Sequence, residues 1–516
     1  MCGKLHLLGL LVGLASALVA APIPPDVATR QAEAWLARRS EPARGRRGKM
    51  RPARKPSGRV RTYGVGGTNL FHLVALEGGG FVAVSAADGQ APVVGFSTSD
   101  ELPTPDDGGP LWALLKADAA ARGSGRSAAS LMGSVANESG IDDVRVSPLV
   151  QSKWDQRYVG GKATYNYYTT NHWYCGCVAT AMAQLMRFHG FPSNVVTPRT
   201  FTCYIVSTDT PVSLTMKGGA YDWANMPLVP TSAIADTERE AIGRICYDAG
   251  VSMRMQYSAS GSGALPFEFD PLRNVFGFAS AHTYLAADEY TTLTDGEVKN
   301  GILANLDAGC PVLLAINNAS ATAGHAILAD GYGYVDGTLY CHLNMGWSGS
   351  YDYWYALPAI PAGGYNFTVV NAITYNVFPD RTGEIVSGRV TDQSGHPLAG
   401  AEVSARVFYT SRSGGWSSSR LKTNVVSTVT ATTGATGVYA LYAPTGRSYS
   451  VLLSATYEGA TTNDITATTS ASASPTSVNY ETGSYTYSGS GLSIGNSWGN
   501  DFVITVKSKF NGFIIR

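Results

Sequence analysis

Charge is scarce in this chain of 516 residues. Charged residues make up 15% of it, and 38 Lys and Arg balance 38 Asp and Glu, so the formal net charge is zero. A chain without a net electric field has no electrostatic attraction to nucleic acid or to an anionic membrane surface, so neither is expected as a partner. Hydrophobic residues reach 44%, which suffices for sizeable cores, and the length predicts about two to four domains.

Cysteine is sparse as well. The seven residues comprise Cys2, near the N-terminus, and six that lie between Cys175 and Cys341. None of them forms the paired C-x-x-C pattern of a zinc site, so a zinc site is not expected. Six cysteines could form disulfides in an exported protein, but they are too few for disulfides to be the main source of stability in so long a chain. The sequence leaves their pairing open.

Long apolar runs are almost absent. The run at Leu7–Val19 follows Lys4 and precedes two alanines, which is the pattern of a secretory signal peptide over residues 1–21 and too short for a membrane-spanning helix. No other stretch is long and apolar enough to cross a membrane. We therefore expect a protein without a transmembrane segment that is secreted by bacterial export, to the extracellular space or the cell surface.

Residues 22–145 predict a small α+β domain. Apolar residues at helical spacing favour a helix over Asp26–Arg38, and alternating strands predict a β-meander over Asn69–Ser97. Between them, the Arg, Pro, Gly and Ser of residues 39–61 favour a loop. A further helix is expected at Gly109–Ala121, followed by a Ser/Gly-rich linker.

The rest of the chain divides in two by composition. Residues 146–378 hold the six remaining cysteines and most tryptophans, and form the largest predicted domain. From about residue 379 cysteine disappears and Thr, Ser, Val and Tyr dominate between turns. That texture predicts an all-β sandwich over residues 379–516.

The strongest chemical signal surrounds Cys177. Apolar residues follow it at helical spacing as far as His189, and Gly190 ends the pattern, so a buried helix should begin at or just after Cys177. Free backbone N–H groups and the helix dipole favour the thiolate there, and the N–H of Cys177 is placed to stabilise an oxyanion. Read by itself, the segment fits a buried structural cysteine equally well.

A thiol nucleophile needs a base, and His325 is the best candidate. It follows a glycine at the start of an apolar strand, 148 residues after Cys177 (325 − 177), within the separation known for papain-like enzymes. The strand should turn near Gly337 and return to Asn344, whose amide is expected to orient the imidazole. Gln156 precedes the cysteine helix and could donate to an oxyanion.

These motifs resemble the streptopain family of papain-like cysteine peptidases. The similar segments occur in family order: Trp154-Asp155-Gln156, Gly176-Cys177-Val178-Ala179-Thr180-Ala181, Tyr221-Asp222-Trp223, Gly324-His325-Ala326 and Asn344-Met345-Gly346-Trp347-Ser348-Gly349. The segments Gly80–Asp88 and Pro92–Ser97 also resemble the inhibitory propeptide of that family. The C-terminal region, with Ile385–Asp392 and Gly395–Val403, resembles a carboxypeptidase regulatory-like domain.

The resemblance implies an α+β fold in which a small α+β prodomain precedes a papain-like peptidase and an all-β sandwich follows. It implies a self-inhibited zymogen that hydrolyses peptide bonds through a thioester, with protein or peptide substrates and its own propeptide as inhibitor. It also implies that the reaction needs no metal and no organic cofactor. Cys177 is then the nucleophile, His325 the base and acid, and Gln156 the oxyanion donor. Asn344 orients the histidine, and Trp347 forms a wall of the site.

Four details of the sequence allow more than one interpretation. Met345 stands where the family usually has tryptophan, and Cys175 lies two residues before the nucleophile, where a bond to Cys203 would brace the site. The segment Ile141–Val146 contains candidate self-cleavage points. The C-terminal domain would serve surface or matrix contact, or be a passive appendage.

Two other functions were weighed. A papain-like scaffold without activity could act as a surface binding or adhesion protein, although the intact Cys, His and Gln positions argue against it. A thiol acyl transferase of the transglutaminase type would use an aspartate where Asn344 stands.

Overall fold

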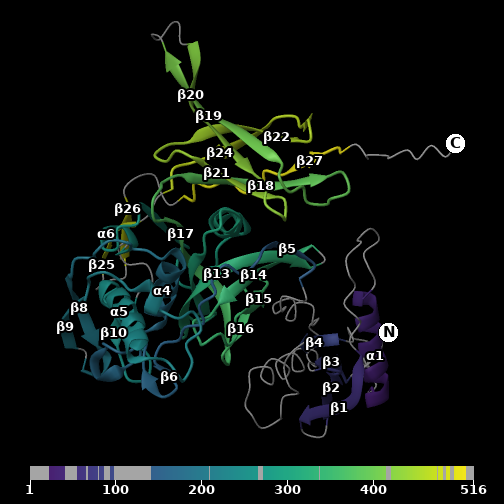
Figure 1. Ribbon diagram of the computed structural model, residues 1–516, viewed down its shortest axis with the longest axis vertical. Coiled ribbons are helices and arrows are strands. Elements are labelled where there is room, and N and C mark those ends of the chain that lie inside the picture. The colour runs from purple at the N-terminus through teal and green to yellow at the C-terminus, as the bar shows by residue number, and fades with distance from the viewer. Residues whose placement is uncertain are drawn as a thin grey trace, which may run out of the picture. The chain divides into compact units, whose positions relative to one another are not determined.

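The computed structural model describes the chain in several stretches, and Figure 1 shows their secondary structure. These are residues 23–40, 55–65, 68–78, 81–86, 93–97, 141–208, 210–264, 271–335, 337–413, 420–472, 475–479, 484–487 and 493–506. The chain separates into two compact units, Met1–Met132 and Gly133–Arg516. The predicted signal peptide and the predicted helix at 109–121 lie outside the described residues. Among the described helices, none has the length and apolar composition that a bilayer crossing requires.

The first unit is one helix on an antiparallel sheet. Its elements are α1 (Pro25–Ser40), β1 (Pro56–Val65), β2 (Thr68–Leu76), β3 (Phe81–Ser85) and β4 (Val93–Ser97), with the strands in chain order across the sheet. Ala28 and Ala32 of α1 pack with Val74 and Val82 of the sheet in one core. The predicted helix and meander are confirmed.

Strand β1 corrects the sequence-based expectation of a loop over residues 39–61. Arginines and a glycine mask the strand in the sequence, but Val60 packs against the core and Tyr63 is buried. Pairing with β2 satisfies the backbone of β1, which local composition cannot reveal.

Two long helices build one half of the domain predicted over residues 146–378, which belongs to the second unit. They are α4 (Cys177–His189) and α5 (Asp236–Ser252), and their buried faces share one core. Short elements surround them: β6 (Tyr158–Val159), β7 (Lys162–Ala163), η2 (Thr170–His172), β8 (Thr200–Ile205), η3 (Val206–Thr208), β9 (Thr210–Thr215), η4 (Trp223–Asn225), β10 (Gln256–Tyr257) and α6 (Pro271–Asn274). The predicted helix therefore begins at Cys177 and ends at Gly190, whose left-handed backbone closes the last turn.

A sheet of eight strands forms the other half. Its order is β11-β17-β12-β13-β14-β15, with β16 added on β17 and β5 on β13. The bounds are β5 (Asp143–Val146), β11 (Ser280–Leu285), β12 (Val312–Asn318), β13 (Gly324–Val335), β14 (Thr338–Asn344), β15 (Tyr353–Tyr355), β16 (Ile360–Ala362) and β17 (Tyr365–Phe378), and the helical turns α7 (Asp295–Glu297), η5 (Val298–Leu303) and α8 (Ala304–Asp307) connect β11 to β12. The predicted hairpin from His325 to Asn344 is confirmed as β13 and β14.

Strand β5 lies across the predicted domain boundary at residue 145. Asp143 and Val144 pair with β13, and Ile141 is buried beside them. The sheet therefore includes residues on both sides of the predicted boundary, and this pairing argues against the predicted self-cleavage within residues 141–146. A protease needs an accessible extended segment, whereas this backbone is already hydrogen-bonded in a sheet.

Most of the C-terminal strands form two sheets that share one core, while β25 and β26 pair with each other in a separate small sheet. One sheet has the order β21-β18-β27, and the other β20-β19-β22-β23 with β24 beside β22. The bounds are β18 (Glu384–Asp392), β19 (Glu402–Ser413), β20 (Arg420–Thr432), β21 (Val438–Ala443), β22 (Tyr449–Tyr457), β23 (Ala460–Thr461), β24 (Ile465–Thr469), β25 (Pro475–Asn479), β26 (Ser484–Tyr487) and β27 (Phe502–Ile504). A two-sheet β domain follows the peptidase region, while its likeness to carboxypeptidase regulatory-like domains stays a prediction.

Candidate active site

Cys177 is the first residue of helix α4, as its chemistry requires. Gly176 before it has φ of 95°, and a Cβ there would lie 2.8 Å from the carbonyl oxygen of Ser262, so only glycine fits this entry to the helix. Burial raises the pKa of the Cys177 thiol. Interactions with the backbone N–H groups of Ala326, Val178 and Cys177 lower that pKa in turn. The sulfur thus lies near Ala326, the residue that follows His325.

His325 is positioned by strand β13 and is 8% exposed. Its Nε2 lies 2.8 Å from the carbonyl oxygen of Met345. A carbonyl can only accept, so Nε2 carries the hydrogen and Nδ1 keeps its lone pair. Burial lowers the pKa of His325 to about 4, against a raising effect of the Met345 carbonyl. The imidazole is therefore neutral at neutral pH.

The structure corrects the expected role of Asn344. Its Oδ1 accepts from Gln184 Nε2 at 2.9 Å and from the Gly346 N–H at 3.1 Å, and its Nδ2 donates to Ser152 O at 2.8 Å. These hydrogen bonds occupy both the oxygen and the nitrogen of the Asn344 side-chain amide, and none of them goes to His325. The Gly346 N–H belongs to the same peptide group as the Met345 carbonyl. Asn344 is therefore linked to His325 through that peptide group and not by a direct hydrogen bond.

Trp347 stands beside the histidine as the sequence predicted. Its ring is stacked on that of His325 with centroids 4.5 Å apart and planes at 23°. Phe367 is also roughly parallel to the imidazole, at 6.2 Å. A Cβ on Gly363 would lie 2.8 Å from the Trp347 ring, so that glycine makes room for it. Met345, by contrast, has a fully buried side chain and serves the site through its backbone.

Gln156 lies on the segment that leads to the helix. Its carbonyl accepts the N–H of Cys175 at 2.9 Å, and its own N–H donates to Asp155 Oδ1 at 2.6 Å. The backbone of Gln156 is thus hydrogen-bonded to that of Cys175, which lies two residues before Cys177. This places the residue beside the start of α4, while the oxyanion role of its amide stays a prediction.

Gln184 and Asp352 are functional candidates that sequence reasoning did not assign. Gln184 is fully buried, and its Oε1 accepts from the Ser152 hydroxyl at 2.9 Å and the Trp154 N–H at 3.2 Å. Asp352 accepts the Met345 N–H at 2.8 Å and pairs with Lys153 at 2.9 Å. Gln184 lies within the helix that the sequence predicted after Cys177, but Asp352 carried no signal because its partners come together only in the fold.

The described cysteines are all free thiols. Cys175 is buried, hydrogen-bonds with Cys246 and lies 3.4 Å from the Thr180 hydroxyl, so the suggested bond from Cys175 to Cys203 is absent. Within the described ranges, no group of three or more His, Cys, Asp or Glu is gathered as a metal would need.

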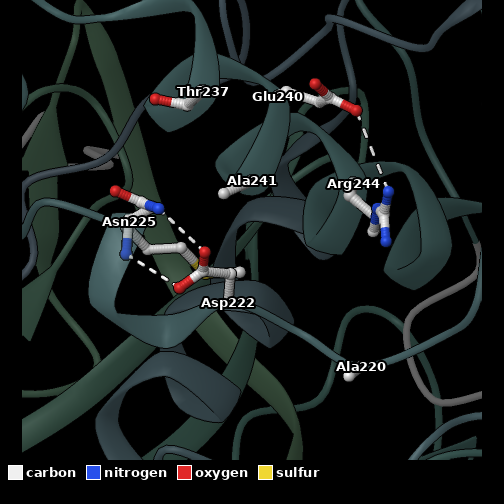
Figure 2. A pocket seen from close by; sticks show the side chains of 8 residues that line it. Ala220, Asp222, Asn225, Thr237, Glu240, Ala241 and Arg244 are labelled. Carbon is white, nitrogen blue, oxygen red and sulfur yellow. Dashed lines mark hydrogen bonds and ion pairs between the residues drawn. The ribbon is translucent and has the colours of Figure 1, made fainter.

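A separate hollow of about 310 Å³ lies between η4 and α5 (Figure 2). Its Glu240 accepts from the Tyr168 hydroxyl at 2.8 Å and lies 3.8 Å from Arg244, and its Asp222 accepts from Asn225. The polar groups thus engage one another, and neither Cys177 nor His325 lines the hollow. The reactive thiol and imidazole belong instead to the region where α4 meets β13.

Comparisons with known proteins agree with this geometry. Residues 154–355 match the Peptidase C10 family, and residues 20–119 match the Spi protease inhibitor family. These matches support a streptopain-like cysteine peptidase region preceded by an inhibitor propeptide domain.

Individual relatives are more distant. The thiol protease/hemagglutinin PrtT of Porphyromonas gingivalis is 33% identical over 177 residues, which are 34% of this chain and 19% of that protein. Streptopain of Streptococcus pyogenes is 27% identical over 208 residues, 37% of this chain and 50% of that protein. The match thus spans half or less of these relatives. Among solved structures, prointerpain A of Prevotella intermedia has 24% identity and a TM-score of 0.44, covering 63% of this chain and 100% of that one.

Proposed function

We propose that the protein is a secreted cysteine endopeptidase made as a self-inhibited zymogen. The observation that carries the proposal is the meeting of α4 and β13. The sulfur of Cys177 receives N–H groups from its own helix and from Ala326, while the Met345 carbonyl fixes the neighbouring His325 with Nδ1 unprotonated. A helix-terminal thiol beside an imidazole with a free lone pair is the arrangement of a thiol nucleophile and its base.

The proposed reaction proceeds through a thioester. Because burial raises the pKa of Cys177 and lowers that of His325, the resting pair is thiol and neutral imidazole. Nδ1 takes the thiol proton as the sulfur attacks the peptide carbonyl carbon, and the N–H of Cys177 with the Gln156 amide binds the oxyanion. The imidazolium then protonates the leaving amine, and water, activated by Nδ1, hydrolyses the thioester.

The inhibitor match over residues 20–119 supports the zymogen. Substrates are proteins or peptides, and the propeptide is the intramolecular inhibitor. Since β5 is part of the sheet and Arg389 holds its Asp143 at 3.0 Å, the activating cut should fall before Ile141. Export and a surface-contact role for the C-terminal domain complete the proposal.

The experiment compares the full chain with its Cys177→Ala variant in the presence of a thiol reductant. We expect only the wild type to shorten and to cleave casein, with a new N-terminus before residue 141. Mass spectrometry and N-terminal sequencing read both outcomes. A wild type that stays intact and inert, even after its prosegment is clipped by another protease, contradicts the proposal.

A further inference from the structure

Two chain segments meet behind the candidate catalytic pair. Residues 152–156 carry Gln156, and residues 344–352 carry the carbonyl that holds His325. Direct bonds join them: Asn344 Nδ2 to Ser152 O at 2.8 Å, Ser348 N to Trp154 O at 3.0 Å, and the Ser348 hydroxyl to Asp155 Oδ2 at 2.6 Å. The oxyanion side and the base side of the site are therefore linked through these two segments.

Asp352 is the charged member of this contact. Its Oδ1 accepts the Met345 N–H at 2.8 Å, and its Oδ2 accepts from Lys153 Nζ at 2.9 Å. The Asp352 side chain is 3% exposed and that of Lys153 is 32% exposed. A buried carboxylate that accepts one N–H and one ammonium group has a well-defined position, because removing either partner leaves its charge uncompensated.

The peptide groups on both sides of Met345 are thereby fixed. Asp352 holds the N–H of the first, and Asn344 holds the N–H of the second, whose carbonyl accepts from His325 Nε2. A carbonyl that is held in this way determines which imidazole nitrogen carries the hydrogen and where the ring points.

The turn that carries these groups is strained. Ser348 and Tyr351 have φ of 54° and 66°, a left-handed backbone that residues other than glycine adopt only at a cost in free energy. Such a turn persists only where its surroundings hold it. Asp352 follows it directly and, with Ser348, connects it to residues 152–156.

We propose that Asp352 is a positioning residue for the reaction. Its carboxylate, held by Lys153, fixes the Met345 backbone, keeps His325 in the Nε2–H form with Nδ1 toward Cys177, and ties this base to the segment of Gln156. The inference rests on the proposed peptidase function and adds to it a residue that touches neither sulfur nor imidazole.

The test measures two rates in the processed full chain. The first is turnover of a peptide substrate, and the second is alkylation of Cys177 by iodoacetamide, followed across pH by peptide mass mapping. Iodoacetamide needs no substrate site, so its rate reports the thiol and its base alone. We expect Asp352→Ala to lower kcat about 10- to 100-fold with KM within about twofold, and to slow alkylation in parallel.

Asp248→Ala is the matched control. Asp248 is also a buried carboxylate that accepts backbone N–H groups, from Lys217 at 2.6 Å and Gly218 at 2.8 Å, and the Tyr221 hydroxyl at 2.7 Å. None of these partners belongs to the two segments. Asp248→Ala should lower Tm yet keep kcat and the alkylation rate. Equal losses of rate in both variants would overturn the proposal, because loosening of the fold would then explain them.

Two milder variants keep the test decisive if Asp352→Ala does not fold. Asp352→Asn retains an acceptor for the Met345 N–H and should lose only about two- to fivefold in kcat, and Lys153→Met should lose a similar amount. Wild-type rates in both would overturn the proposal. If the wild type itself cleaves nothing, the peptidase function fails, and the alkylation rates still decide the role of Asp352.

Discussion

The active site and the contact between the peptidase region and the C-terminal β domain both contain buried polar side chains, but they use them differently. We call that contact the joint. Hydrogen bonds connect four of its polar side chains, which are Asn376, Glu384, Ser472 and Asn496. The side-chain amides of Asn376 and Asn496 form two hydrogen bonds with each other, of 3.0 and 2.9 Å. Glu384 accepts hydrogen bonds from the Ser472 backbone N–H at 2.8 Å and from the Ser472 hydroxyl at 2.7 Å.

At the candidate active site one atom is kept as a free acceptor. His325 donates its Nε2–H to the Met345 carbonyl, which leaves a lone pair on Nδ1. A closed network stabilises an arrangement, whereas a site that performs chemistry keeps a reactive lone pair available. Variants of the joint should therefore change stability, and variants of the site should change rate.

His325→Ala should have the largest effect, and this effect should be on the rate of peptide hydrolysis and not on stability. Without its base the thiol stays protonated, so peptide hydrolysis should fall about 10³-fold or more, with Tm within a few degrees of wild type. Peptide turnover and calorimetry measure the two quantities. Residual activity within about tenfold of wild type would assign the base elsewhere.

Asn496→Ala should show the reverse at the joint. Asn496 also accepts the Ile385 N–H at 2.7 Å and donates to Asn300 O at 3.0 Å, so its loss leaves several buried groups unpaired. We expect a loss of about 2–4 kcal/mol in the free energy of unfolding and unchanged kcat on a short peptide. Denaturant unfolding measures the stability, and turnover of a short peptide measures kcat. A kcat that falls together with the stability would contradict the separation of the joint from the site.

The pH dependence of stability should separate the two regions by sign. Burial raises the pKa of Asp307, which accepts from Tyr332 and Ser387 across the same contact, to about 7. Its stabilising effect is complete below the ordinary carboxyl pKa near 4 and is lost as pH rises through 7. For His325, whose pKa is lowered to about 4, stability is complete above the ordinary imidazole pKa and is lost as pH falls through 4.

Asp307→Asn tests this sign. The variant should gain about 1–3 kcal/mol relative to wild type between about pH 4 and pH 8, because the amide has no proton to lose. Unfolding free energies measured across that range give the slope. A wild-type slope that the substitution leaves unchanged would show that Asp307 titrates normally.

Trp347→Leu should have the smallest effect. The ring lies against His325 at 4.5 Å but makes no bond to its nitrogens, so its loss should lower kcat about three- to tenfold through a less confined imidazole. Trp354→Leu, which removes a buried tryptophan from β15, is the control and should act on Tm instead. Equal kinetic effects of the two variants would deny Trp347 a special position.

Much of the fold could be predicted because the signals are local. The period of apolar residues after Cys177 and the glycine at 190 define α4 at both ends, and alternation marks the hairpin of His325 and Asn344. Strand β5 was missed because its partner β13 lies far along the chain. Strand β1 pairs with the next strand, β2, and was missed because its arginines and glycine hide the alternation of a strand.

The sequence by itself determined the reacting types of residue, their order and the helix that presents the thiol, since these follow from side-chain chemistry and helical periodicity. Only the tertiary structure decided how the histidine is held. Met345 offers a backbone carbonyl, which every residue has, and Asn344, Gln184 and Asp352 form their bonds across segments that the sequence separates by up to 199 positions. Hydrogen bonds of that kind depend on three-dimensional proximity, which no local pattern records.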